Sequence, residues 1–72
     1  MTGREFAKFR RSIGRTLVQM APILGFKSKQ SLDYQEGLDK VAIVLELFYN
    51  YSQRYGAEEA EIEFKRKFRK KS

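Results

Sequence analysis

The side chains that could do chemistry in this chain of 72 residues are acidic and basic ones, because it contains neither histidine nor cysteine. It therefore has no thiol nucleophile, no zinc ligands of the usual types, and no side chain that ordinarily titrates near neutral pH. An acid–base pair would have to come from Asp and Glu alone, and these fall at positions typical of helix surfaces. We expect no enzymatic activity, no metal, no cofactor and no small-molecule substrate.

Basic charge is concentrated towards the two ends of the sequence. The net charge is +6; residues 1–31 contribute +6, residues 32–56 contribute −2 and residues 57–72 contribute +2. Clustered basic charge suits a polyanionic partner, because each neutralised phosphate releases counterions. The alternative interpretation of the charge alone is a solvated surface that keeps a small protein soluble.

Apolar residues recur at spacings of three and four along most of the chain, which is the pattern of amphipathic helices. Thr2 and Thr16 are suitable N-caps for the first two helices, and Gly25 is placed to end the second. Pro22 conflicts with a regular second helix, which must either be kinked or begin later than Thr16. The predicted fold class is all-α, a compact bundle of about five short helices near residues 3–13, 16–24, 28–36, 39–55 and 57–70.

The helix predicted over 39–55 is apolar nearly all round, so it must be buried nearly all round. In so short a chain this indicates either the centre of the bundle or a contact with another subunit. We predict a homodimer through the 41–51 segment. Its interface is expected to include some of Val44, Leu47, Phe48 and Tyr51.

The last helix begins with acidic residues and ends with basic ones, which complements the helix dipole. The pairs Glu61–Lys65 and Glu63–Lys67 have the favourable i,i+4 spacing. Phe64 is expected to dock on the long helix. Lys65 to Lys71 would form a mobile basic arm with non-specific affinity for phosphates, or would serve only the dipole and solubility.

The stretch 17–37 carries the most specific pattern, and it resembles the helix-turn-helix of the Cro/C1 (XRE-type) family of phage-repressor-like transcription regulators. The resemblance covers roughly residues 4–48. The anchor positions, matched without insertion or deletion, are Ala21, Gly25, Phe26, Tyr34 and Gly37. Membership would place a helix-turn-helix DNA-binding domain in residues 1–56 and a C-terminal amphipathic helix with a basic tail in residues 57–72.

Several positions depart from the family pattern. Leu17 stands where many members have a glutamine that contacts the DNA backbone, and Pro22 falls inside the second helix. Ser31 occupies the position of the buried aliphatic residue of the recognition helix, with Leu32 next to it, and the acidic residue after the aromatic is displaced to Glu36. These departures leave open which face of that helix is turned outward.

The resemblance implies that the N-terminal end of the recognition helix reads base edges in the major groove. The candidate base-contacting residues are Lys27, Ser28, Lys29, Gln30 and Asp33. Gln30 is suited to adenine and Lys29 to guanine. The candidate phosphate-contacting residues are Arg10, Arg11, Arg15, Thr16 and Lys40. The alternative is that Lys27–Ser31 is a solvated loop and that Arg10 and Arg11 are solvated helix surface.

Sequence-specific binding of double-stranded DNA, as a small repressor-type transcription regulator, is the predicted function. A second hypothesis is a basic helical structural or interaction subunit of a larger, nucleoprotein or protein, assembly. A third is an amphipathic protein whose basic C-terminus binds anionic lipid. The longest apolar run is too short to span a membrane, and the first residues lack the apolar stretch of a secretory signal, so no membrane role is favoured and a cytoplasmic location is expected.

Overall fold

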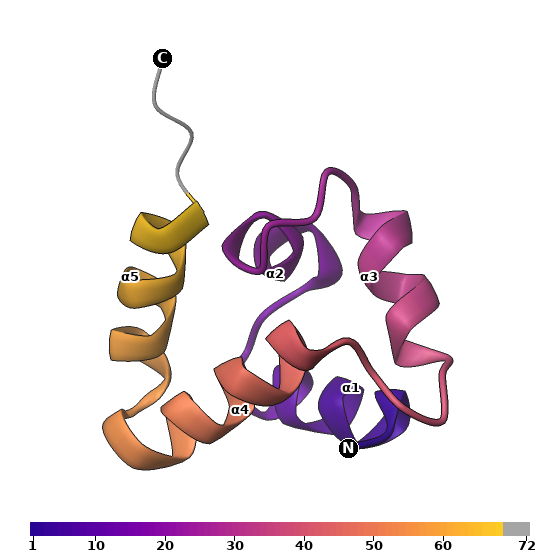
Figure 1. Cartoon of the computed structure of the whole chain (residues 1–72), viewed down its shortest axis with the longest axis horizontal. Coiled ribbons are helices and arrows are strands. Elements are labelled where there is room, and N and C mark those ends of the chain that lie inside the picture. Colours follow the sequence, from indigo (N-terminus) through magenta and orange to yellow (C-terminus); the bar gives the residue numbers. More distant parts are fainter. Residues whose placement is uncertain (69–72) are drawn as a thin grey trace.

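Five α-helices account for the regular structure of residues 1–68, the part of the chain that the computed structural model describes. They are α1 (Gly3–Ser12), α2 (Leu17–Ile23), α3 (Lys29–Glu36), α4 (Ile43–Tyr55) and α5 (Ala57–Phe68). Helices α3 and α5 lie at opposite edges of the molecule with α2 between them, while α1 and α4 pack together below (Figure 1). The predicted all-α bundle is confirmed.

Capping side chains fix where the first two helices begin. The hydroxyl of Thr2 accepts a hydrogen bond from the backbone N–H of Glu5, and the Glu5 carboxylate accepts one from the N–H of Thr2. Thr16 and Gln19 form the same reciprocal arrangement at α2. Each box satisfies two N–H groups that have no partner inside the helix. The predicted caps Thr2 and Thr16 are confirmed.

Helix α2 contains Pro22 and ends almost immediately after it, at Ile23. Gly25 adopts a left-handed φ of 84°, and the backbone N–H groups of Gly25 and Phe26 donate to the carbonyls of Pro22 and Ala21. This is a Schellman ending, which requires a residue that tolerates positive φ. Helix α2 begins at Leu17, directly after the Thr16 cap, so the alternative of a later start is wrong; Pro22 is its sixth residue and has no N–H to donate to the Val18 carbonyl.

The predicted start of the long helix was wrong by four residues, because α4 begins at Ile43 and not at residue 39. The N–H of Val41 donates to the carbonyl of Met1, and the N–H of Ala42 donates to the side-chain oxygen of Gln35. The backbone of residues 41–42 is thus committed to the N-terminal segment and to α3. Met1 is distant in sequence from Val41 and Gln35 precedes Ala42 by seven residues, and the apolar pattern of residues 39–55 contains no sign of either partner.

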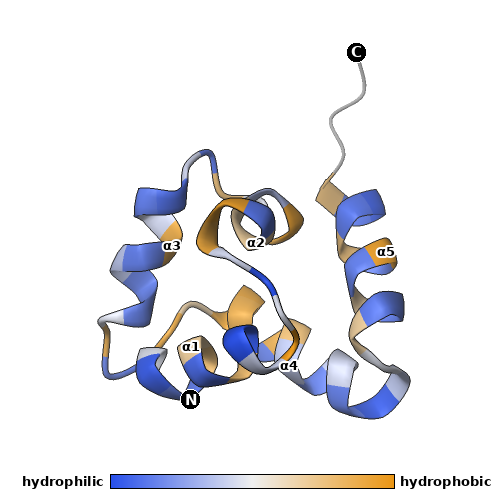
Figure 2. Ribbon diagram, turned by 180° about the vertical axis from the view of Figure 1, so that it is seen from behind, coloured by the Kyte–Doolittle hydropathy of each residue, from blue (hydrophilic) through white to orange (hydrophobic). Residues whose placement is uncertain are grey.

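One apolar core joins all five helices, and apolar residues line the inner side of α2 and α4 (Figure 2). Phe6, Met20, Leu32, Leu45 and Phe48 are fully buried in it. Helix α5 adds Ala60 and Phe64, and the ring centroids of Phe64 and Phe48 lie 5.2 Å apart. The predicted docking of Phe64 on the long helix is confirmed. Phe48 faces this core, so we withdraw it from the predicted dimer interface.

Gly3 brings α1 into direct contact with the end of α3. A Cβ at this position would lie 2.4 Å from the carbonyl oxygen of Gln35 and from the carbonyl carbon of Glu36. The N–H of Gly3 also donates to the carbonyl of Leu38. Only a residue without a side chain fits this approach.

None of the helices within residues 1–68 has the length and apolar character needed to cross a bilayer.

Candidate nucleic-acid interface

The outward face of α3 is set by one buried leucine. Leu32 is fully buried, whereas its neighbour Ser31 is exposed, so the inward position has moved by one residue from the family pattern. Successive residues of a helix are about 100° apart, which places Gln30 and Tyr34 on the side opposite Leu32. Both are exposed, Tyr34 to 68%. The departure at Ser31 therefore has a definite outcome, an outward face of α3 built around Gln30 and Tyr34.

The N-terminal end of α3 presents polar and basic groups to solvent. Lys27, Ser28, Lys29 and Gln30 are all exposed. Ser28 is the N-cap residue but makes no side-chain hydrogen bond to the helix; its hydroxyl lies 3.5 Å from that of Ser31. The first N–H groups of α3 thus keep their capacity to donate, and two lysines flank them. Such an end suits an anionic ligand.

Asp33 lies on the flank of α3 that faces α1, and it is not at the N-terminal end with the other predicted base-contacting residues. It lines a shallow hollow together with Arg4 and Arg11 of α1. All three side chains are exposed. The predicted phosphate contact Arg11 therefore lies beside the outward face of α3. Glu36 also lines the hollow but is paired with Arg10, which leaves two arginines beside the carboxylate of Asp33.

Arg10 occupies a very different environment from Arg11. Its Nε and Nη2 donate to the two carboxylate oxygens of Glu36 at 2.7 and 3.0 Å, and its Nη1 donates to the carbonyl of Arg15 at 2.8 Å. The two side chains are only 8% and 7% exposed. A guanidinium with these partners is not available to a phosphate, so we withdraw Arg10 from the predicted phosphate contacts.

Arg15 and Thr16 lie at the N-terminal end of α2. The Nε of Arg15 donates to the Oε2 of Glu61 in α5 at 2.6 Å, and this pair raises the pKa of Arg15. One third of the Arg15 side chain remains exposed. The Thr16 hydroxyl accepts the capping hydrogen bond, which leaves its proton free to donate. Lys40 is exposed in the connection between α3 and α4.

The basic C-terminal segment is helical as far as Phe68. Neither predicted i,i+4 ion pair forms: Glu61 pairs with Arg15, and Glu63 pairs with Arg66 at 2.6 Å. The expected mobile arm was therefore wrong for Lys65–Phe68, which continue α5. Its remainder, from Arg69 to Lys71, lies outside the described residues, as do the last residues of the helix predicted over 57–70.

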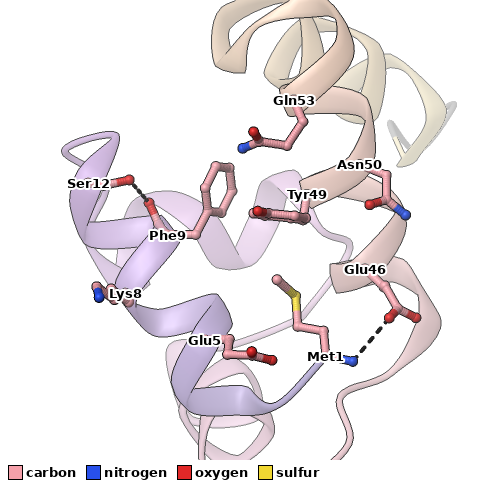
Figure 3. A pocket seen from close by; sticks show the side chains of 9 residues that line it. All are labelled: Met1, Glu5, Lys8, Phe9, Ser12, Glu46, Tyr49, Asn50 and Gln53. Carbon is pink, nitrogen blue, oxygen red and sulfur yellow. Dashed lines mark hydrogen bonds and ion pairs between the residues drawn. The ribbon is translucent and has the colours of Figure 1, made fainter.

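A groove between α1 and α4 brings two carboxylates, Glu5 and Glu46, to one side of the molecule (Figure 3). The Met1 amine lies 3.0 Å from the Glu46 Oε2. The hydrogen bond from the Thr2 N–H lowers the pKa of Glu5. The Glu46 carboxylate thus binds the Met1 amine and the Glu5 carboxylate binds the Thr2 N–H, so both hold the first two residues in place. Residues 1–68 contain no cluster of three or more Asp and Glu side chains able to hold a metal ion.

Sequence reasoning left the exposed Tyr34 out of the candidate site residues and assigned Arg10 to the wrong role. The signal for Tyr34 was available, since a residue two positions from a buried leucine points away from the core of a helix. The partner of Arg10 is 26 residues distant in sequence, so no local pattern indicates it. No protein-family model, curated protein or solved structure matches this chain.

Proposed function

We propose that this protein binds double-stranded DNA sequence-specifically as a small repressor-type transcription regulator. The observation that carries the proposal is the exposed N-terminal half of α3, with Lys27, Lys29 and Gln30 beside helix N–H groups that have no side-chain cap. Helix α3 packs against α2 and places Leu32 in the core, so its polar face is held on the outside of the bundle. An α-helix with such a polar face fits the major groove of B-DNA.

In this proposal α3 enters the major groove and α2 lies across the adjacent backbone. Gln30 pairs with adenine, Lys29 donates to guanine acceptors, and Tyr34 contacts the neighbouring base edges or sugars. Arg11, Arg15, Thr16 and Lys40 contact phosphates, which position the protein without reading sequence. Asp33, flanked by Arg4 and Arg11, accepts from a cytosine amino group at the edge of the same surface.

The test separates base reading from phosphate binding. A preferred site is first selected from random duplexes, and affinities are then measured for that site and for a scrambled duplex. Gln30→Ala and Lys29→Ala should each cost about 1–3 kcal/mol on the preferred site and relax its sequence preference. Arg11→Ala and Arg15→Ala should weaken binding to both duplexes equally. Four variants that behave alike would show that α3 does not read bases.

The second candidate function is that of a subunit in a larger assembly, and one observation favours it. Ile43 and Leu47 of α4 are 67% and 47% exposed on one flank of the helix, beside the partly buried Val44 and Tyr51. Such a strip suits a contact with another protein, either a different subunit or a second copy of this chain. The homodimer predicted through the 41–51 segment would cover it. Sedimentation at high micromolar concentration should then show a dimer, and Leu47→Glu should yield a monomer of unchanged helicity. A wild-type monomer that binds no duplex would favour a different protein partner for the strip.

A further inference from the structure

Helix α5 is fixed along the whole length of α2. At the start of α2 the Arg15–Glu61 ion pair joins the two segments, and Glu61 is itself buried. At the other end the Phe68 ring lies against the turn after α2, where a Cβ on Gly25 would come within 2.9 Å of the Phe68 Cδ1. The basic last turn of α5 is therefore held at the same end of the molecule as the α2–α3 turn (Figure 1).

Two lysines of that turn point to different flanks of α5. Lys65 lines a groove between α5 and α2, together with the polar residues Arg15 and Gln19 and the apolar residues Pro22 and Ile23. Lys67 lies on the other flank, where its Nζ is 6.0 Å from the centre of the Phe64 ring. Both lysines are exposed, and neither forms an ion pair with another residue of the described chain.

The groove has an excess of positive charge. Its carboxylate, Glu61, is neutralised by Arg15, which leaves the ammonium of Lys65 without a counter-charge from the groove. Arg15 and Thr16 are the residues proposed to contact phosphate at the start of α2. A phosphate bound at the start of α2 would lie beside the same groove. The flexible four-carbon side chain of Lys65 would let its ammonium reach that phosphate.

We infer that Lys65 is a further phosphate contact, which extends the DNA-binding surface from α2 onto α5. This inference rests on the proposed function, since it needs duplex DNA to cross the N-terminal end of α2. It assigns α5 a role in binding beyond its role in the core. It also distinguishes Lys65 from Lys67, which has the same charge and lies in the same turn but faces away from α2.

The experiment compares Lys65→Ala with Lys67→Ala on two unrelated duplexes between about 50 and 200 mM salt, by fluorescence anisotropy. One phosphate contact contributes about 0.9 to the log–log salt slope. Lys65→Ala should lower the slope by that amount on both duplexes, so its affinity deficit should shrink about threefold across this salt range. Lys67→Ala should leave the slope unchanged, and Lys65→Arg should restore it. Circular dichroism verifies that all variants keep the wild-type helicity.

Equal slopes for Lys65→Ala and Lys67→Ala, with wild-type protein that binds DNA, would overturn the inference and leave the proposed function standing. A wild-type protein that binds neither duplex would overturn both. A loss confined to one of the two duplexes would also contradict the inference, because a phosphate contact carries no sequence preference.

Discussion

The guanidinium of Arg10 and the carboxylate of Glu36 form a two-point ion pair between α1 and α3, with Nε–Oε2 and Nη2–Oε1 distances of 2.7 and 3.0 Å. Both side chains are almost completely buried. The third contact of Arg10, with the carbonyl of Arg15, ties the same group to the connection before α2. One side chain therefore holds in place the segments that flank the proposed DNA-binding surface.

The first prediction concerns this pair. Arg10→Met leaves the Glu36 carboxylate buried without its partner, which should cost about 3–5 kcal/mol of unfolding free energy. The double variant Arg10→Met, Glu36→Leu should recover most of that loss, since it removes both charges together. Urea unfolding followed by circular dichroism measures both, with Arg11→Met as the exposed control. An Arg10→Met protein as stable as the control would contradict the assigned role.

The second prediction concerns the close approach of α1 to α3. Gly3→Ala places a Cβ against backbone atoms of Gln35 and Glu36, which cannot move aside without shifting α3, so it should destabilise the fold by about 1–3 kcal/mol. Gly37→Ala is the matched control. Its Cβ would meet only the Tyr34 carbonyl oxygen, at an ordinary 3.5 Å, and φ there is −94°. The control should be neutral or stabilised by about 0.4–1 kcal/mol. Similar thermal shifts for the two variants would refute the contact.

The third prediction concerns acid sensitivity. The capping hydrogen bond from the Thr2 N–H lowers the pKa of Glu5 in the folded state from its ordinary 4.5. A lowered folded-state pKa means that this stabilisation is complete above about pH 4.5 and is lost as the pH falls through the folded value. Glu5→Gln keeps the acceptor, as Gln19 does in the corresponding box of α2, but does not titrate.

Melting temperatures of wild-type protein and Glu5→Gln, measured from pH 7 to pH 3, test this point. The other carboxylates titrate in both proteins, so the difference between the curves isolates Glu5. The wild type should lose stability relative to the variant below about pH 4.5. Curves that stay parallel over the whole range would show that the Glu5 cap does not depend on charge.

The local elements of this fold could be predicted from its sequence, whereas the long-range contacts could not. Thr2, Thr16 and Gly25 mark helix ends through hydrogen bonds made within a few residues, so their roles follow from the residue types alone. The start of α4 depends on the Met1 carbonyl and the Gln35 side chain, which meet residues 41–42 only in the folded chain. Propensity gives no information on such partners.

The same distinction applies to the candidate site. The exposed end of α3 agrees with the predicted Lys27–Gln30 segment, because a run of polar residues at a helix start has no apolar face to bury. Arg10 and Arg11 are adjacent and identical in type, yet one is buried against Glu36 and the other faces solvent. Their difference depends on which side of α1 meets α3. Glu61 pairs with Arg15 and not with the predicted partner Lys65, and this choice of partner depends in the same way on how α5 packs.

The central claim is that this protein binds duplex DNA through its basic surface, and the salt dependence of that binding tests it most directly. With Arg11, Arg15, Thr16, Lys40 and Lys65 as the proposed backbone contacts, about four to five phosphates are engaged. Binding to a mixed-sequence duplex should then weaken with a log–log slope of roughly −3.5 to −4.5, at about 0.9 per phosphate. Measurable binding at about 50 mM salt that declines along this slope is the expected result. No measurable binding at that salt concentration would contradict the account.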